Sequence, residues 1–155
     1  MTTTTPTTTA ARVRSASPSD LTAVEQLLLE NSLPLIGVRD ALADFVVAEA
    51  DGGIIGVAGL EVCCDYALLR SVAVSASWRK HGVGRALVNR LIANAESRGI
   101  RALYLLTTTA EHYFPSFGFA RTTREAVPAE VRATAEFQGA CPDSAVVMQR
   151  RLTPR

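Results

Sequence analysis

The 155-residue sequence has no apolar run near the roughly 18 residues that a membrane-spanning helix requires, so we expect no membrane segment. Its net charge is only +1, which gives no electrostatic reason to expect a nucleic acid or an anionic membrane as a partner. Residues 1–10 are almost all threonine, with neither the apolar core of a secretory signal nor the arginines of a transit peptide. We therefore expect a disordered tail over residues 1–10 and a cytoplasmic protein.

Cysteine is scarce. The chain has Cys63, Cys64 and Cys141, an odd number with no CxxC spacing and no cluster with histidine. Such a set makes a poor disulfide framework, favours a reducing compartment and offers no zinc site. We interpret these cysteines as small buried residues and expect no metal ion.

Hydrophobic periodicity predicts one α/β domain over residues 11–152. Strands are expected at 12–14, 45–50, 54–62, 66–74, 102–106 and 145–152. Helices are expected at about 18–30, between Gly84 and Gly99 and at 109–117, with a last helix or an irregular excursion over 127–137. Turn signals after the second and third strands predict an antiparallel meander, and strand, helix and strand over 68–106 predict a parallel pair. We expect a mixed, twisted sheet with helices on both faces.

The most informative stretch follows the strand at 66–74. A short loop leads into the basic, glycine-bearing segment Arg79-Lys80-His81-Gly82-Val83-Gly84-Arg85, which opens into a helix. Backbone N–H groups at a helix N-terminus form an anion site, and glycine lets the backbone approach a ligand closely. We interpret all seven residues of this segment as a pyrophosphate cradle.

Three glycine-loop patterns compete for this segment. A P-loop needs GxxxxGK[ST], which the chain does not supply. The dinucleotide fingerprint GxGxxG fails because Leu87 replaces its third glycine, although Ala86 lies close by. The third pattern, [RQ]xxGxG[AR], is matched in full from Arg79 to Arg85.

With Val72-Ala73-Val74 before this match and Phe117-Gly118-Phe119 after it, the sequence resembles the GNAT superfamily of acetyl-CoA-dependent N-acetyltransferases over about residues 11–152. The resemblance implies the GNAT fold, acetyl-CoA as co-substrate and a small-molecule amine as acceptor. It implies that the backbone of Val72, Ala73 and Val74 holds the pantetheine arm and polarises the thioester carbonyl. The acceptor would then attack directly, without a covalent acetyl-enzyme.

The transfer also needs a base and, in many GNAT members, a tyrosine acid four residues before the glycine of the GF ending. Phe114 occupies that position here. Its neighbour Tyr113 is the candidate acid, although one step along a helix turns a side chain by about 100°. Glu61 is the leading candidate for the base, with an exposed hairpin carboxylate as the alternative. His112 is a weaker candidate.

Arg70 lies on an otherwise apolar strand and needs an anionic partner if it is buried. That partner is either a substrate carboxylate or an internal salt bridge to Glu49, Glu61 or Asp65. The segment Leu106-Thr107-Thr108-Thr109 resembles N-acetylglutamate-synthase-type GNAT enzymes, as does Leu69-Arg70-Ser71. The resemblance makes Arg70, Ser71 and Thr108 candidate acceptor-binding residues.

The C-terminal third resembles the arsenic-resistance GNAT acetyltransferases, through Val127-Pro128, Ala133-Thr134-Ala135-Glu136-Phe137 and Cys141-Pro142-Asp143-Ser144-Ala145. This implies a glutamate-like acceptor such as arsinothricin or phosphinothricin. An alternative is that the three cysteines bind trivalent arsenic directly. A non-catalytic acetyl-CoA sensor and a peptide N-acetyltransferase are rival functions, and the oligomeric state stays open, a homodimer included.

Overall fold

The computed structural model describes residues 11–140 and 144–152. The expected tail over 1–10 and Cys141 lie outside the described residues. Within the described part, seven strands form one mixed sheet in the order β1-β2-β3-β4-β5-β7-β6. The strands are β1 (Arg12–Ser15), β2 (Phe45–Ala50), β3 (Gly53–Cys63), β4 (Tyr66–Val74), β5 (Ala102–Thr107), β6 (Ala120–Thr122) and β7 (Val146–Arg151).

The first four strands form the expected antiparallel meander. A tight turn joins β2 to β3, and Asp51 and Gly52 both have positive φ angles, 54° and 79°. Two consecutive positive φ angles suit the right-handed twist of a hairpin, and aspartate followed by glycine tolerates them well. Turn chemistry therefore sets the pairing next to the turn, and the register shifts once between Ala48 and Glu49.

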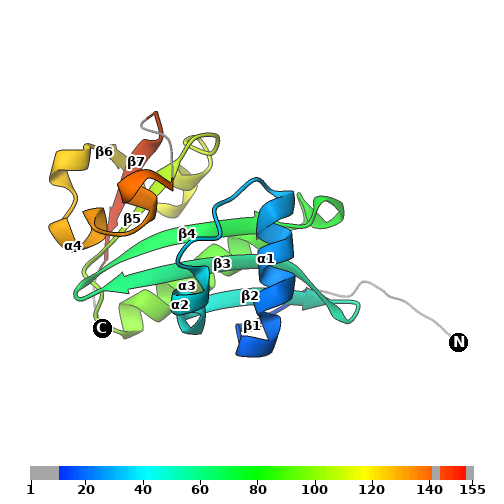
Figure 1. The fold of residues 1–155 in the computed structure, drawn as a ribbon. Helices are drawn as coiled ribbons and strands as arrows, with labels where there is room; N and C mark the ends of the chain where they lie inside the picture. The colour runs from blue at the N-terminus through cyan, green and yellow to red at the C-terminus, as the bar shows by residue number, and fades with distance from the viewer. Residues whose placement is uncertain (1–10, 141–143, 153–155) are drawn as a thin grey trace, which may run out of the picture.

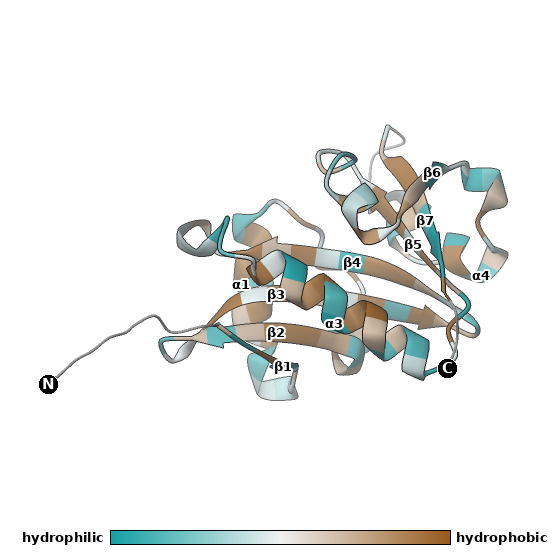
Figure 2. Cartoon of the chain, turned by 180° about the vertical axis from the view of Figure 1, so that it is seen from behind, coloured by the Kyte–Doolittle hydropathy of each residue, from teal (hydrophilic) through white to brown (hydrophobic). Residues whose placement is uncertain are grey.

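Helices cover both faces of the sheet, as expected (Figure 1). The helices α1 (Leu21–Glu30) and α2 (Val38–Ala41) pack on one face, in a core with Phe45, Val57 and Ala73. The helix α3 (Val83–Ser97) packs on the other face, and the strands beneath it are mostly hydrophobic (Figure 2). The short helix α4 (Ala129–Arg132) covers a smaller core over β4, β5 and β7.

The strands β4 and β5 are parallel but stay paired only at their beginnings. Tyr66, Ala67 and Leu68 pair with 102–104, and beyond Leu68 the two strands no longer pair with each other, although β4 stays paired with β3 and β5 with β7. The continuing halves therefore diverge and leave unpaired backbone on both sides of a gap. Near this point β4 also carries a bulge, where Ser71 has a positive φ of 61°.

Two expectations of secondary structure were wrong or incomplete. The helix expected over 109–117 is only a 3-10 turn, Phe114–Phe117, because Pro115 cannot donate a helical hydrogen bond. The edge strand β6 was not expected, since three residues carry too little periodicity to be recognised. The excursion over 127–137 contains α4, and a further helical turn spans Glu136–Ala140.

Asp20 supplies a test of the N-terminal part of this fold. Its carboxylate receives two hydrogen bonds from Arg14, at 2.8 and 3.0 Å, and another from the backbone N–H of Ser17. The bonds from Arg14 are the main reason that the pKa of Asp20 falls from 3.8 to about 2.

Because the folded-state pKa is depressed, this stabilisation is present above about pH 4 and is lost as the pH falls towards 2. We expect Asp20→Asn to lower the free energy of unfolding by about 2 kcal/mol at pH 7 and to flatten its decline between pH 4 and 2. Urea unfolding at a series of pH values measures both effects. An equally steep acid decline in the variant would contradict the assignment.

Candidate active site

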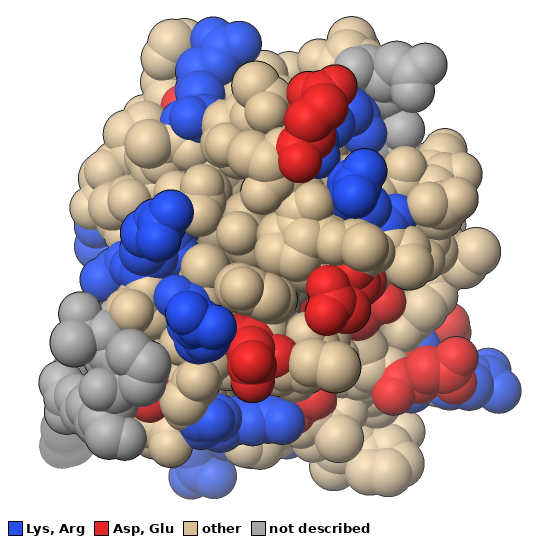
Figure 3. Space-filling model, turned by 90° about the vertical axis from the view of Figure 1, so that its left-hand side faces the viewer, with Lys and Arg blue, Asp and Glu red and all other residues tan. Residues whose placement is uncertain are grey.

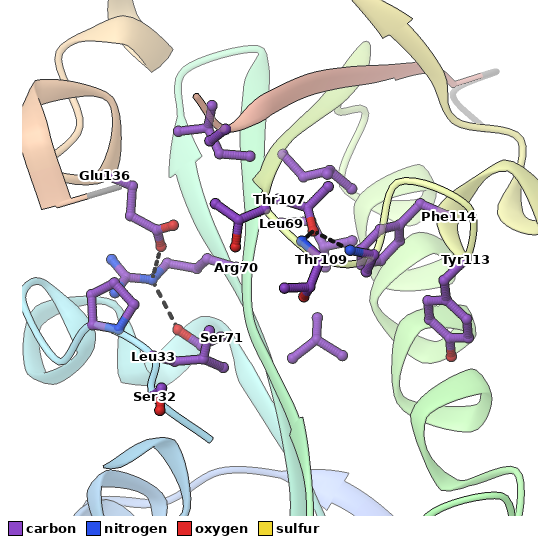
Figure 4. A pocket seen from close by; sticks show the side chains of 17 residues that line it. Ser32, Leu33, Leu69, Arg70, Ser71, Thr107, Thr109, Tyr113, Phe114 and Glu136 are labelled. Atoms are coloured by element: carbon purple, nitrogen blue, oxygen red, sulfur yellow. Dashed lines mark hydrogen bonds and ion pairs between the residues drawn. The ribbon is translucent and has the colours of Figure 1, made fainter. Parts of the chain in front are cut away.

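A cavity of about 300 Å³ fills the gap between the diverging halves of β4 and β5. We call it the acceptor cavity. Its walls come from β4, from β5 and the loop after it, from the loop after α1, and from the C-terminal segment (Figure 4). The lining residues are Ser32, Leu33, Pro34, Leu69, Arg70, Ser71, Val72, Leu105, Leu106, Thr107, Thr108, Thr109, Ala110, Tyr113, Phe114, Glu136 and Ala145.

Arg70 is the charged centre of the acceptor cavity, and its side chain is fully buried. Its Nη1 lies 2.9 Å from Glu61 Oε1, and its Nε lies 2.9 Å from Glu136 Oε2. The internal salt bridge is therefore present, with Glu61 as one of the expected partners. Glu49 instead pairs with Arg14.

Glu136 is a site residue that the sequence reading missed. Its side chain is 7% exposed, and it reaches Arg70 from a segment far along the chain. The available signal was a glutamate inside the apolar stretch 133–137, together with an arginine that needed a partner. Glu61, by contrast, contacts Arg70 but does not belong to the lining of the acceptor cavity.

A smaller cavity of about 220 Å³ lies at the N-terminus of α3, and we call it the cradle. Gly82 precedes the helix with a φ of 81°, and no side chain caps the helix there. The first N–H groups of α3 are thus available to a ligand. The lining residues are Val74, Trp78, Arg79, Lys80, Gly82, Val83, Gly84, Arg85 and Tyr113.

The basic side chains around the cradle have different partners. Arg79 donates to Asn31 Oδ1 at 2.9 Å, which ties the cradle to the loop after α1. The guanidinium of Arg85 lies 4.7 Å from the centre of the Phe117 ring. His81 packs edge-on against Trp78 and does not belong to the cradle lining. Lys80 lines the cradle and is exposed.

The end of β4 runs between the acceptor cavity and the cradle. Val72 lines the acceptor cavity and Val74 lines the cradle. Ala73 is buried in the core under α1, so only its backbone could serve a ligand on this side. Ser71 and Thr108 both line the acceptor cavity, where Ser71 Oγ accepts a hydrogen bond from Arg70 Nε at 3.0 Å.

Tyr113 and Phe114 diverge, although they are neighbours. Phe114 is buried against other aromatic rings, whereas Tyr113 is 37% exposed and points away from Arg70, towards α3 (Figure 4). A Cβ added at Gly84 would lie 3.1 Å from the Tyr113 hydroxyl. Tyr113 lines both the acceptor cavity and the cradle, so it stands where they meet. Burial raises the pKa of Tyr113 by more than the nearby Arg85 lowers it. The hydroxyl therefore keeps its proton at neutral pH.

The described cysteines do not suit nucleophilic or thiolate chemistry. Burial raises the pKa of Cys63 to about 11, so its thiol is protonated at neutral pH. Cys63 is only partly buried and Cys64 is exposed, so the expectation of buried cysteines was wrong for these two residues. Neither lines the acceptor cavity or the cradle. Among the residues with described positions, no cluster of three or more metal-ligating side chains occurs.

Charges of both signs are interspersed on the molecular face shown in Figure 3, in keeping with the small net charge of the chain. No helix within residues 11–140 and 144–152 is long and apolar enough to cross a membrane.

Comparison with known proteins gives a consistent family. A family model described as an acetyltransferase (GNAT) domain matches residues 41–121. The chain is 34% identical over 131 residues to an amino-acid acetyltransferase of Mycobacterium tuberculosis, covering 77% of this chain and 74% of that protein. It is 32% identical over 99 residues to an amino-acid acetyltransferase of Azotobacter vinelandii, covering 63% of this chain but only 23% of that longer protein.

Solved structures have the same fold. Rv2747 of Mycobacterium tuberculosis, in complex with CoA, aligns with a TM-score of 0.78 at 26% identity, covering 92% of this chain and 99% of that one. N-acetylglutamate synthase of Neisseria gonorrhoeae, complexed with coenzyme A and N-acetyl-glutamate, aligns with a TM-score of 0.80 at 24% identity. That alignment covers 98% of this chain and 37% of the synthase.

The burial of Arg70 generates a stability prediction. Replacing Arg70 with alanine leaves Glu61 and Glu136 facing each other without their shared cation, so we expect the free energy of unfolding to fall by about 3–5 kcal/mol. The matched control is Arg121→Ala, which breaks an exposed pair with Glu111 and should cost less than about 1 kcal/mol. Urea denaturation of both variants gives the comparison, and equal losses would contradict a buried cluster.

Proposed function

The chain belongs to the acetyltransferase (GNAT) domain family, and from this premise we propose that it transfers the acetyl group of acetyl-CoA to the α-amino group of a small amino-acid acceptor. One observation carries the proposal: a phosphate-type cradle and a charged cavity adjoin along the end of β4, with Tyr113 lining both. A ligand whose pyrophosphate binds in the cradle would place its acyl end in the acceptor cavity.

The residues of the cradle fit such a ligand. The uncapped N-terminus of α3 offers N–H donors, and Lys80 lines the same cavity with a positive charge. Gly84 leaves room that a side chain would take from a bound group. The unpaired half of β4 offers backbone donors and acceptors to an amide-containing arm. Acetyl-CoA supplies the thioester that the acceptor amine attacks.

The candidate acid and base differ in position. Tyr113 retains its proton at neutral pH and lies at the junction of the cavities, which suits an acid for the departing thiolate. Glu61 is the proposed base, but it stands behind Arg70 and outside the cavity lining. A proton that reaches Glu61 from the acceptor must therefore pass through water.

For the acceptor, we propose an amino acid of glutamate-like shape, including antimetabolites such as arsinothricin and phosphinothricin. Two features support this class: the amino-acid acetyltransferase names of the relatives, and the resemblance of the C-terminal third to arsenic-resistance acetyltransferases. A cavity of about 300 Å³ is large enough for a free amino acid, whereas a peptide usually needs a longer groove.

A screen for release of the CoA thiol tests this function. The chain is incubated with acetyl-CoA and one candidate acceptor at a time: free amino acids, phosphinate and arsenical analogues of glutamate, or short peptides. We expect release with α-amino acids and none with the same compounds after N-acetylation. Binding of CoA without any acceptor-dependent release would indicate a sensor, and release with peptides alone would indicate a peptide acetyltransferase.

The cradle assignment can be tested separately at Gly84. A valine there would crowd Val74 and the Tyr113 hydroxyl, so we expect Gly84→Val to raise the apparent KM for acetyl-CoA at least about tenfold, the loss of roughly one charge-assisted hydrogen bond. The matched control is Gly53→Ala, because a Cβ at Gly53 meets nothing within 4 Å. An unchanged KM in a folded Gly84→Val protein would overturn the assignment.

A further inference from the structure

The guanidinium of Arg70 has two edges with different surroundings. One edge is closed by the protein itself: Nη1 donates to Glu61 at 2.9 Å, and Nη2 donates to the carbonyl oxygen of Ile36 at 2.7 Å. The backbone of Gly37 packs against this edge so tightly that an added Cβ would lie 2.9 Å from Nη1. A ligand in the acceptor cavity cannot reach this edge without moving the loop.

The other edge, at Nε, faces the acceptor cavity. Its single N–H donates to Ser71 Oγ at 3.0 Å, and Glu136 Oε2 lies 2.9 Å from Nε as an ion-pair partner (Figure 4). Ser71 and Glu136 both line the cavity, whereas Glu61 does not. The part of Arg70 nearest to a bound acceptor is thus already in contact with a carboxylate of the chain.

The positive charge of Arg70 is shared between two carboxylates, those of Glu61 and Glu136. An acceptor with a second acidic group would bring a further negative charge into a confined space. That group would compete with Glu136 for the positive charge at the Nε edge of Arg70.

We propose that Glu136 is a specificity-determining residue that competes with an acidic side chain of the acceptor for Arg70. The inference rests on the proposed acetyl transfer to amino acids and adds a selection rule to it. Glu136 weakens the binding of acceptors with a second acidic group and leaves acceptors with a neutral side chain unaffected. Removing its charge leaves the positive charge at this edge of Arg70 to the acidic group of the acceptor, while Glu61 still holds the opposite edge.

The test compares L-glutamate with L-glutamine, which are nearly equal in size and differ by one charge. Their kcat/KM values are measured with saturating acetyl-CoA for the wild-type chain, Glu136→Gln and Glu61→Gln. Where one of the two is not turned over, its inhibition constant against the best acceptor of the screen replaces kcat/KM. Each ratio compares the two acceptors on the same protein. A lower amount of active enzyme, or the loss of a base that serves both acceptors, therefore leaves the ratio unchanged.

We expect the preference for glutamate over glutamine to rise about tenfold in Glu136→Gln, because one carboxylate charge beside the acidic group of the acceptor is removed. In Glu61→Gln the preference should change by less than about twofold, because the group removed lies outside the cavity. If Glu136→Gln does not fold, Glu136→Asp takes its place. Its shorter arm withdraws the carboxylate from Nε, so a smaller rise is expected.

If the preference is unchanged in the Glu136 variants and only their stability is lower, Glu136 has a purely structural role and the proposal is overturned. An equal rise in Glu61→Gln would also overturn it, because the effect would then follow the charge of the cluster as a whole. Absence of acetyl transfer to every amino acid by the wild-type chain would instead refute the proposed function itself. Fluorescence of Trp78, the single tryptophan and a cradle residue, verifies that CoA still binds to each variant.

Discussion

The end of pairing between β4 and β5 is the constraint on which the rest of the site depends. Two parallel strands that separate after three paired residues leave unpaired N–H and C=O groups on both sides of the gap. Buried backbone groups of this kind need partners, and a ligand with amide groups can supply them. The acceptor cavity, the bulge at Ser71 and the proximity of the cradle all follow from this separation.

The burial of Arg70 in the wall of that gap imposes a second requirement. A buried guanidinium has to be paired, and here it receives carboxylates from β3 and from the C-terminal segment. Arg70 also holds two segments against the sheet: its hydrogen bond to the carbonyl of Ile36 holds the loop after α1, and its ion pair with Glu136 holds the C-terminal segment. Cohesion of the cavity walls thus depends on one cluster, and our proposal assigns acceptor specificity to the same cluster.

Local patterns predicted the parts of the structure that local forces decide. The bounds of β2 and β4 agree with the expected ranges, and the cradle lies where the basic glycine loop meets α3. The expected helix over 109–117 was wrong because Pro115 interrupts its hydrogen bonding. The partners predicted for Arg70 all lay on or beside the neighbouring hairpin strands. The prediction therefore included Glu61 but not Glu136, which is distant in the sequence.

The sequence by itself determined most of the order of strands and helices, predicted a glycine loop for a pyrophosphate, and showed that a buried Arg70 needs an anionic partner. Each of these follows from periodicity, turn chemistry or the charge of a single residue. Only the tertiary structure decided that Glu136 lines the cavity, that Glu61 stands behind it, and that Tyr113 turns towards α3 while Phe114 enters the core. These positions depend on how segments distant in the sequence pack together, and no local pattern encodes that packing.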